Sequence, residues 1–356
     1  MKRIPTIEDV ARKASLSIST VSLVINNKKN VSDKTRQKVQ KAIDELGYHP
    51  HRGARGLASS LTGNIGFILS HDHFSLAEPF YTKIFLGAEF AARDLNYYVL
   101  LTTVSSQKRP KNGIPRFLLE RNVDGIIIAG KVDEQLVTTI EQFDIPIVLI
   151  DYTFPRKDLS NVCIDNTGGV RLAVSHLVEQ GYTDIGFVGG DLEHPSIRER
   201  LSAYRATMEE NGLPVDEKII STGEADTGHE NGFSAIARMH KGNRLPAAIF
   251  AANDAMAIGC MQYLKSVSQR IPEDVAVIGF DDIEMSSHVE PHLTTVRVFK
   301  EEMGKLGVKR LVEMIKSKTN TIVSIRVPVQ FMVRDSTVIQ HAPDEGLRAA
   351  PAGAIY

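Results

Sequence analysis

From Asn64 onward the chain alternates apolar, β-rich runs with stretches of helical periodicity, and this alternation most constrains its fold. The apolar runs are IGFIL, YYVLL, VDGIIIAG, IPIVLID, DIGFVGG, AAIFAAND and VAVIGFDD. Helical patterns lie between them, for example at 85–95, 170–180 and 255–266. Near-continuous apolar strands separated by helices are typical of parallel sheets covered on both faces. Because the set repeats loosely, we expect two doubly wound α/β lobes.

Polar side chains follow the predicted strands at the edge where such sheets bind ligands. Ligands of doubly wound sheets lie beyond the carboxyl ends of the strands, which here is the cleft between two lobes. The side chains concerned are Ser70, His71, Asp72, Asp151, Tyr152, Asn253, Asp254, Phe280, Asp281 and Asp282, with His194, Ser196, Arg198 and Arg200 in a further loop. Carboxylates, amides, arginines and aromatic rings together suit a polyhydroxylated or small polar ligand. Each aspartate alone could equally be a helix cap, and Asp254 and Asp282 suit capping best.

The first 60 residues differ from the rest in their charge. They hold 12 Lys+Arg against 5 Asp+Glu, whereas the rest of the chain holds 30 against 38. The net charge of −1 hides this asymmetry. A small basic unit joined to a larger acidic one indicates a polyanionic partner, and a solvated basic surface without a partner is the alternative.

Three short helices are predicted in this basic head. Thr6 caps the first helix with Asp9 in the capping-box position, Ser17 caps the second, and Ser32 caps the third, which Gly47 ends. The first two helices are separated by a tight turn, as in a helix-turn-helix. The predicted core of the head comprises Val10, Leu16, Val21, Val24, Ile25, Val39, Ile43 and Leu46.

The second helix, within SISTVSLVIN, has a buried stripe and a leucine on its opposite, polar face. The stripe contains Val21, Val24 and Ile25, whereas Leu23 points outward among serines. The second helix of a helix-turn-helix enters the major groove, where an outward leucine suits thymine methyl groups. An isolated exposed leucine without a partner is the alternative. We expect base contacts from Ile18, Ser19, Ser22 and Leu23, and contacts to the DNA backbone from Thr6, Thr20 and Asn26.

Five motifs stand in order and without a gap in residues 5–58: DVA, S-x-S-TVS, VS-x-KTR-x-KV, ELGY-x-P and A-R-x-L. With these motifs, the segment closely resembles the head of the LacI/GalR family of bacterial transcription regulators. The resemblance implies that Ile18, Ser19 and Leu23 choose the operator sequence. It also implies a hinge segment that folds on DNA and inserts Leu57 into the minor groove. The flanking positions Ala54 and Arg55 then contact the DNA backbone.

Residues 64–335 resemble the effector-binding core of the same family, which is itself similar to periplasmic sugar-binding proteins. Arg200 in RLSAY matches the arginine that grips the effector, and Asp281 in GFDD matches a second effector ligand. The resemblance implies an effector site of Phe80, Tyr81, Asp151, Tyr152, Ser196, Arg200, Asn253 and Asp281. A sugar or sugar derivative is the expected effector, and a nucleoside stays open.

These features together predict a transcription regulator that acts as a repressor and binds a palindromic double-stranded operator as a homodimer. An effector between the lobes then changes the affinity for DNA by linkage. We expect a DNA-binding domain at 1–50, a hinge segment at 51–63, the effector-binding core at 64–335 and a disordered tail at 336–356. The tail lacks the leucine heptads of a tetramerising coil, which favours a dimer.

Other classes of protein fit the sequence less well. No G-x-G-x-x-G opens a helix after a strand, no P-loop is present and no catalytic triad has suitable spacing, so we predict no enzyme and no cofactor. The sequence HDH at 71–73 does not aim three ligands at one metal ion. A free sugar-binding transport protein would require a signal peptide, which the N-terminus does not resemble. With no apolar run long enough to span a membrane, and with Cys163 and Cys260 as buried thiols, we expect a cytoplasmic protein.

Overall fold

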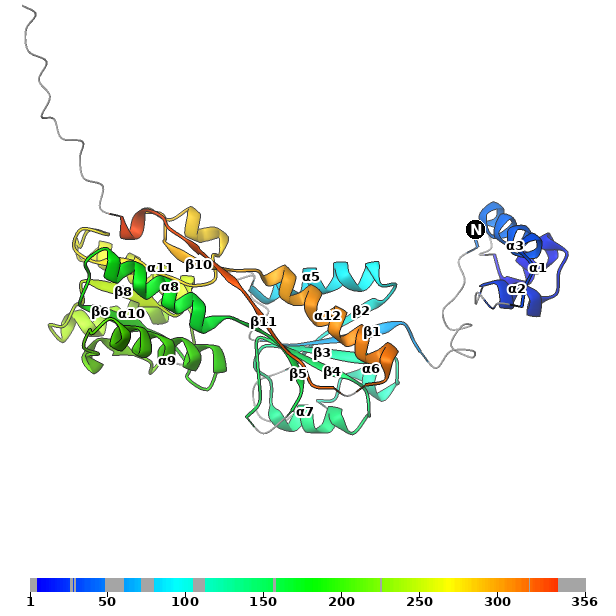
Figure 1. The fold of residues 1–356 in the computed structure, drawn as a ribbon, viewed down its shortest axis with the longest axis horizontal. Coiled ribbons are helices and arrows are strands. Elements are labelled where there is room, and N and C mark those ends of the chain that lie inside the picture. The colour runs from blue at the N-terminus through cyan, green and yellow to red at the C-terminus, as the bar shows by residue number, and fades with distance from the viewer. Residues whose placement is uncertain are drawn as a thin grey trace, which may run out of the picture.

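The computed structural model describes residues 5–25, 28, 30–48, 61–71, 80–104, 113–155, 158–224, 226–319 and 321–338. Three N-terminal helices form the head, and the remaining described residues form two α/β lobes (Figure 1). Within these ranges, none of the helices combines the length and the apolar character that crossing a bilayer requires.

The head consists of α1 (Ile7–Ala14), α2 (Ile18–Ile25) and α3 (Asp33–Leu46). The predicted caps are confirmed. The carboxylate of Asp9 accepts a hydrogen bond from the Thr6 amide at 2.9 Å. The hydroxyls of Ser17 and Ser32 accept from the amides three residues later, at 3.1 and 3.3 Å. Gly47 ends α3 with φ 61°, a left-handed conformation that glycine adopts without strain.

The core of the head forms where the periodicity predicts it. Val10, Val21, Val24 and Val39 are buried, and Leu16, Ile25, Ile43 and Leu46 pack partly buried against them. Tyr48 is buried as well. It lies beyond the end of α3, so helical periodicity could not have placed it in the core.

Lobe 1 contains a six-stranded parallel sheet in the order β11-β5-β4-β3-β1-β2. Its strands are β1 (Asn64–Ser70), β2 (Tyr98–Val104), β3 (Gly125–Ala129), β4 (Ile147–Ile150), β5 (Ser160–Ile164) and β11 (Ser324–Val327). Helices α5 (Phe80–Asp94) and α12 (Lys300–Ser317) cover one face, where Phe67 and Ile127 are buried. Helices α6 (Arg116–Leu119) and α7 (Glu134–Glu141) contribute to the cluster on the other face, with Ile68 and Ile126. Apolar residues therefore occupy both faces, as the continuous apolar strands predicted.

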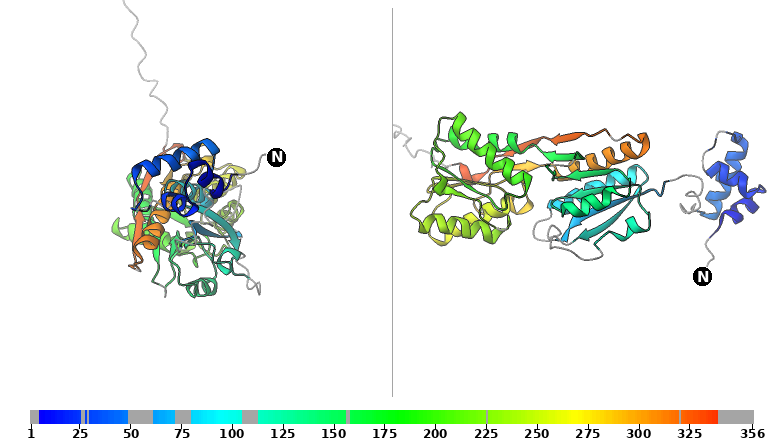
Figure 2. Two further views of the ribbon diagram at one scale, coloured as in Figure 1. Left: turned by 90° about the vertical axis from the view of Figure 1, so that its right-hand side faces the viewer. Right: turned by 90° about the horizontal axis from the view of Figure 1, so that it is seen from below.

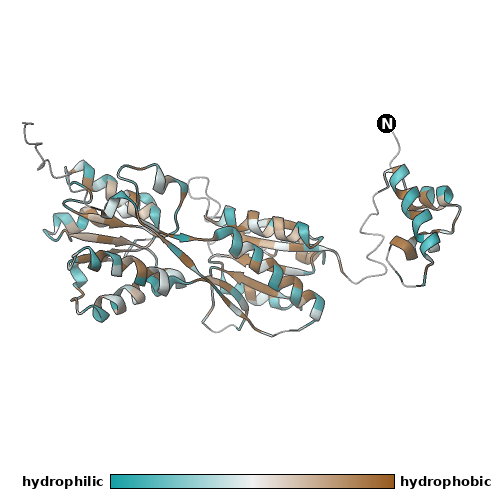
Figure 3. Cartoon of the chain, turned by 45° about the horizontal axis from the view of Figure 1, so that its top comes forward, coloured by the Kyte–Doolittle hydropathy of each residue, from teal (hydrophilic) through white to brown (hydrophobic). Residues whose placement is uncertain are grey.

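Lobe 2 contains a four-stranded parallel sheet in the order β7-β6-β8-β9 and an antiparallel pair beside it. The strands are β6 (Ile185–Val188), β7 (Ile220–Ser221), β8 (Ala248–Ala251), β9 (Ala276–Ile278), and the pair β10 (Thr295–Val298) and β12 (Val329–Met332). The helices are α8 (Asn166–Glu179), α9 (Pro195–Glu210), α10 (His229–Lys241) and α11 (Asp254–Ser266). Figure 3 shows the apolar strands of both lobes lying between more polar helices. The expected pair of α/β lobes with parallel sheets is confirmed.

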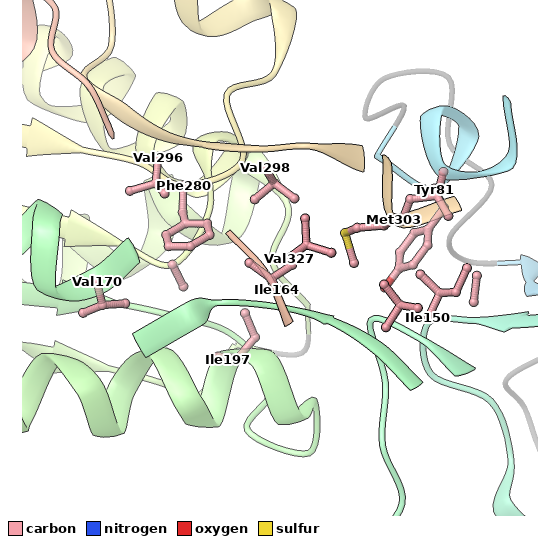
Figure 4. Close-up of a cluster of buried hydrophobic side chains, with 14 of the residues drawn as sticks. Tyr81, Ile150, Ile164, Val170, Ile197, Phe280, Val296, Val298, Met303 and Val327 are labelled. Carbon is pink, nitrogen blue, oxygen red and sulfur yellow. The ribbon is translucent and has the colours of Figure 1, made fainter. Parts of the chain in front are cut away.

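The chain crosses between the lobes three times. The crossovers join β5 to α8, β10 to α12, and β11 to β12. The right-hand view of Figure 2 shows the two lobes from below, with the connecting segments between them. One apolar cluster continues through this region, from Tyr81, Ile150 and Met303 in lobe 1 to Val170 and Phe280 in lobe 2 (Figure 4). The lobes are therefore joined by three connections and by a common core next to them.

Candidate effector site and DNA-contacting helix

The outward face of α2 presents the side chains predicted to contact bases. Ile18 and Leu23 are 48% and 42% exposed, whereas Val21 and Val24 are buried. Ser19 is exposed, and its hydroxyl lies 2.8 Å from that of Ser17. The helix therefore places two large apolar side chains in solvent, where a DNA groove can reach them.

The other residues predicted to contact DNA are only partly described. Thr6 and Thr20 are half-buried at the starts of α1 and α2, and Ser22 is half-buried within α2. Asn26, Ala54, Arg55 and Leu57 lie outside the described residues.

Asp151 joins the two lobes through its carboxylate. It follows β4 of lobe 1 and is 5% exposed. One carboxylate oxygen accepts from the hydroxyl of Ser196 in lobe 2 at 3.0 Å, and the other accepts from the hydroxyl of Tyr81 in lobe 1 at 2.9 Å. Its φ is 58°, a left-handed conformation that is uncommon outside glycine and typical of functional positions. Burial, followed by the charge of Asp151, raises the pKa of Tyr81, so that its hydroxyl stays a donor.

Arg200 occupies the centre of the polar cluster in lobe 2. It is buried in α9, with its Nε 2.8 Å from Oδ1 of Asn166 and one terminal nitrogen on the carbonyl of Ala252. The other terminal nitrogen lies 3.5 Å from Oδ1 of Asp281, and the guanidinium carbon lies 3.7 Å from the centroid of the Phe280 ring. These contacts hold the planar guanidinium in one orientation.

Asp281 carries a second buried carboxylate, at the end of the β9 segment. Its φ is 110°, and it is 9% exposed. Burial raises its pKa to about 6, although the charges of Arg200 and Lys300 oppose the shift. Lys300, which begins α12, donates to the carbonyl of Asp281 and so connects this segment to a crossover.

Comparison with known proteins agrees with this arrangement. Residues 6–51 match "Bacterial regulatory proteins, lacI family", and residues 174–337 match "Periplasmic binding protein-like domain". The HTH-type transcriptional regulator CelR of Thermobifida fusca is 34% identical over 342 residues, which cover 94% of this chain and 99% of the relative.

The chain belongs to the LacI family of bacterial transcriptional regulators.

Solved structures of LacI-family proteins have the same fold. A CelR–cellobiose complex matches with a TM-score of 0.70 at 32% identity, covering 93% of this chain and 99% of that one. A lac repressor dimer bound to operator and the anti-inducer ONPF matches with a TM-score of 0.78 at 30% identity, covering 94% and 100%. The relatives are transcriptional regulators, so this LacI-family chain is a DNA-binding regulator rather than an enzyme.

The structure corrects the predicted cap of α11 in this LacI-family site. The sequence favours Asp254 as the cap of α11, but Asn253 is the cap, and its Oδ1 accepts from the Met256 amide at 2.9 Å. The Nδ2 of Asn253 donates to the carbonyl of Thr227 at 3.0 Å. Both polar groups of Asn253 thus make hydrogen bonds within lobe 2. An effector bound by Asn253 would have to share these groups with Met256 and Thr227.

Asp254 and Asp282 hold the strand ends together instead of capping helices. Asp254 is fully buried and accepts from the amide of Ile283 at 2.8 Å and from the hydroxyl of Ser286 at 2.7 Å. Burial, followed by the charge of Asp281, raises the pKa of Asp254 to about 7. Asp282 binds Arg297 and Arg334, each at 2.6 Å. The preference for caps was wrong because the donors come from strands and loops distant in sequence.

The aromatic residues predicted for the site lie on the lobe 1 side. The rings of Phe80 and Tyr81 are 5.0 Å apart at the start of α5, and Nζ of Lys300 lies 5.6 Å from the Phe80 ring. The ring of Tyr152 lies 4.9 Å from that of Phe154. These rings provide apolar surface beside Asp151.

His194 stands out in the structure more than in the sequence. Its Nδ1 accepts from the Ser196 amide at 3.3 Å, which caps α9, and its ring lies 5.5 Å from that of Tyr152 across the lobe interface. Its Nε2 lies 3.9 Å from Asp151. Burial lowers the pKa of His194 to about 4, so it is neutral near pH 7. In the sequence, only the position of His194 in the loop after a predicted strand indicated that it could line the cleft.

Among the residues that the structure describes, no cluster of His, Cys, Asp or Glu could hold a metal ion. His71 is exposed at the end of β1, and Asp72 and His73 lie outside the described ranges. Cys163 and Cys260 are both buried as free thiols, as predicted.

Proposed function

We propose that this LacI-family regulator binds a palindromic operator as a homodimer and represses transcription under the control of a sugar-like effector. The effector occupies the polar cluster between the lobes, and the DNA is read by α2. Domain boundaries at 1–50, 51–63 and 64–335 and a cytoplasmic location belong to the same proposal. The predicted tail of 336–356 begins later than expected, because Ser336 and Thr337 are fully buried and the Ser336 hydroxyl accepts from the Thr294 amide at 2.8 Å.

One observation carries the proposal for the effector. The carboxylate of Asp151 in lobe 1 and the hydroxyl of Ser196 in lobe 2 are 3.0 Å apart and buried, and the hydroxyl of Tyr81 donates to the same carboxylate. Arg200 lies about one helical turn after Ser196 on α9. A hydroxylated ligand can replace such a contact by hydrogen bonds to both lobes, because carboxylates accept from hydroxyls and guanidinium groups donate to oxygens. The ligand then binds one relative arrangement of the lobes more tightly, which is the requirement for linkage.

The proposed contacts divide between the two sites. For the effector they are Phe80, Tyr81, Asp151, Tyr152, Ser196, Arg200, Asn253 and Asp281. For DNA they are Ile18, Ser19, Ser22, Leu23 and Leu57 to bases, and Thr6, Thr20, Asn26, Ala54 and Arg55 to the backbone.

The nature of the relatives supports a neutral sugar as the first candidate. The solved CelR structure is a complex with cellobiose, and other relatives include the ribose operon repressor of Escherichia coli. We therefore place cellobiose and ribose in the first panel of ligands, with nucleosides and nucleobases as the alternative class.

The experiment is a selection of duplexes by the full chain, followed by a ligand screen. Enrichment of a palindromic consensus is expected, and its enrichment should change when the effector is added. The effector is found as the compound that raises the melting temperature by mass action. A chain that enriches no sequence at low ionic strength would contradict the proposal.

A further inference from the structure

Among the residues that the structure describes, two lysine or arginine side chains form ion pairs between the lobes, and in the strand order of lobe 1 they lie on either side of Asp151. Nζ of Lys131 in lobe 1 lies 2.7 Å from Oδ2 of Asp191 in lobe 2. Arg326 on β11 of lobe 1 binds both carboxylate oxygens of Glu199 in lobe 2, at 3.0 and 3.2 Å. The two pairs differ in their distance from the crossovers.

The strand order places the Lys131–Asp191 pair away from the crossovers. Lys131 follows β3, which is separated from the crossover strand β5 by β4, so it lies about 10 Å along the sheet at the usual strand spacing. Asp191 follows β6, and β8 and β9 separate that strand from the segment that continues into β10. Arg326, by contrast, is next to the crossover from β11 to β12. A rotation of the lobes about the crossovers therefore separates Lys131 from Asp191 more than it separates Arg326 from Glu199.

The Lys131–Asp191 pair is also a weak ion pair that can break at little cost, because both side chains are partly exposed. The two side chains are 40% and 33% exposed, so solvent and salt screen their attraction. Asp191 accepts a further hydrogen bond from the Glu193 amide at 2.8 Å, which fixes its carboxylate toward the interface. Burial alone would raise the pKa of Asp191, but the bonds from Lys131 and the Glu193 amide lower it, so the group stays ionised at neutral pH.

We propose that Lys131 and Asp191 form an electrostatic latch that favours the closed arrangement of the lobes before any effector binds. The closed arrangement is the one in which Lys131 contacts Asp191, whether Asp151 binds Ser196 directly or an effector lies between them. Its consequence for regulation rests on the proposed function: a latch that populates the closed state lowers the effector concentration needed to complete the closure. Rising ionic strength releases the latch, so it also links the response to salt.

The test measures the distance between the lobes in the full chain, without DNA or effector. Spin labels are attached to Gln135→Cys on α7 and Ser202→Cys on α9, both exposed positions, while the native cysteines are buried. Labelled chain is diluted with unlabelled chain, so that distances within one protomer dominate. Lys131→Gln and Asp191→Asn should each lower the ratio of closed to open molecules by about two- to fivefold, the size of a partly exposed ion pair.

The charge exchange Lys131→Asp with Asp191→Lys should restore the distance distribution of the parent chain. Raising KCl from 0.05 to 0.5 M should lengthen the distance in the parent and have little effect in Lys131→Gln. Arg171→Gln is the matched control, because Arg171 and Glu210 form a 2.7 Å ion pair within lobe 2.

Distances in Lys131→Gln and Asp191→Asn that equal those of the parent overturn the latch, as does an equal response in Arg171→Gln. The result does not depend on the proposed function, because neither operator nor effector is present. A chain with a working latch that selects no duplex would leave the latch standing and remove the regulatory role.

Discussion

The guanidinium of Arg200 lies over the ring of Phe280, with its central carbon 3.7 Å from the ring centroid. Arg200 also donates hydrogen bonds to Asn166, at the start of α8, and to Asp281. The residue proposed to grip the effector is therefore held from three directions before a ligand arrives. Such pre-organisation reduces the entropy lost on binding.

Replacing Phe280 should weaken effector binding while DNA binding is kept. In Phe280→Leu the guanidinium loses its aromatic support, and a desolvated cation–π contact of about 0.5–2 kcal/mol corresponds to a loss of affinity of roughly 2- to 30-fold. Isothermal titration with the sugar identified by the melting screen measures this loss. Phe90→Leu is the control, because Arg93 lies over that exposed ring at 5.2 Å, far from the site on α5. An unchanged affinity in Phe280→Leu would show that Arg200 does not need the ring.

Leu23 should determine the base preference at one symmetric pair of operator positions. Its outward side chain is 42% exposed on α2, and arginine in its place can donate to guanine where leucine contacts a thymine methyl group. We expect duplex selection with Leu23→Arg to shift the consensus at that pair, by about 1–3 kcal/mol in favour of guanine. Leu172→Arg, at a comparably exposed leucine of α8, should return the parent consensus. The same consensus from Leu23→Arg and the parent would exclude a base contact at this position.

Asp254 should make the protein less stable as the pH rises from about 4 to about 7. Burial and the charge of Asp281 raise its pKa to about 7, so the folded state holds a proton that the unfolded state has already lost. Stability is then lost through this window, by at most about 1.4 kcal/mol per pH unit. The asparagine variant Asp254→Asn has no carboxyl group to titrate at this position. Its free energy of unfolding minus that of the parent should therefore increase from about pH 4 to about pH 7 and stay constant above pH 7, as measured by urea unfolding at each pH.

Asp274→Asn provides the contrast for this experiment. The hydrogen bonds from Arg270 lower the pKa of Asp274 to about 2. The parent should therefore be the more stable of the two above pH 4, and this advantage should disappear as the pH falls toward 2. A difference between Asp254→Asn and the parent that does not change with pH would contradict the role assigned to burial.

Gly304→Ala should destabilise the contact between α5 and α12. A Cβ at Gly304 would overlap the carbonyl of Ile84, which is backbone and cannot move aside without shifting a helix. Overpacking of this kind costs about 1–3 kcal/mol. Thermal melting should show the loss, whereas Gly242→Ala, at the end of α10 with its nearest atoms at 3.4 Å, should melt like the parent. Equal melting temperatures for Gly304→Ala and the parent would mean that the helices separate at little cost.

The sequence by itself determined the features that depend on local pattern. The strand runs predicted the parallel sheets, because a strand buried on both faces needs apolar residues without interruption. Thr6, Ser17, Ser32 and Gly47 marked the helix ends of the head, because capping involves residues only three or four positions apart. Arg200 and Asp151 could be predicted as site residues for the same reason: Arg200 belongs to a local sequence motif, and Asp151 stands at the end of a predicted strand.

The tertiary structure decided which polar groups meet. The sequence favoured Asp254 and Asp282 as helix caps and Asn253 as an effector contact, but their hydrogen bonds go to Ser286, Arg334 and Thr227, which are 26 to 52 positions away. The pairing of Lys131 with Asp191, 60 positions apart and on different lobes, likewise followed no sequence pattern. Hydrogen bonds and ion pairs act over a few ångströms, so their partners are fixed only once packing has brought distant segments together.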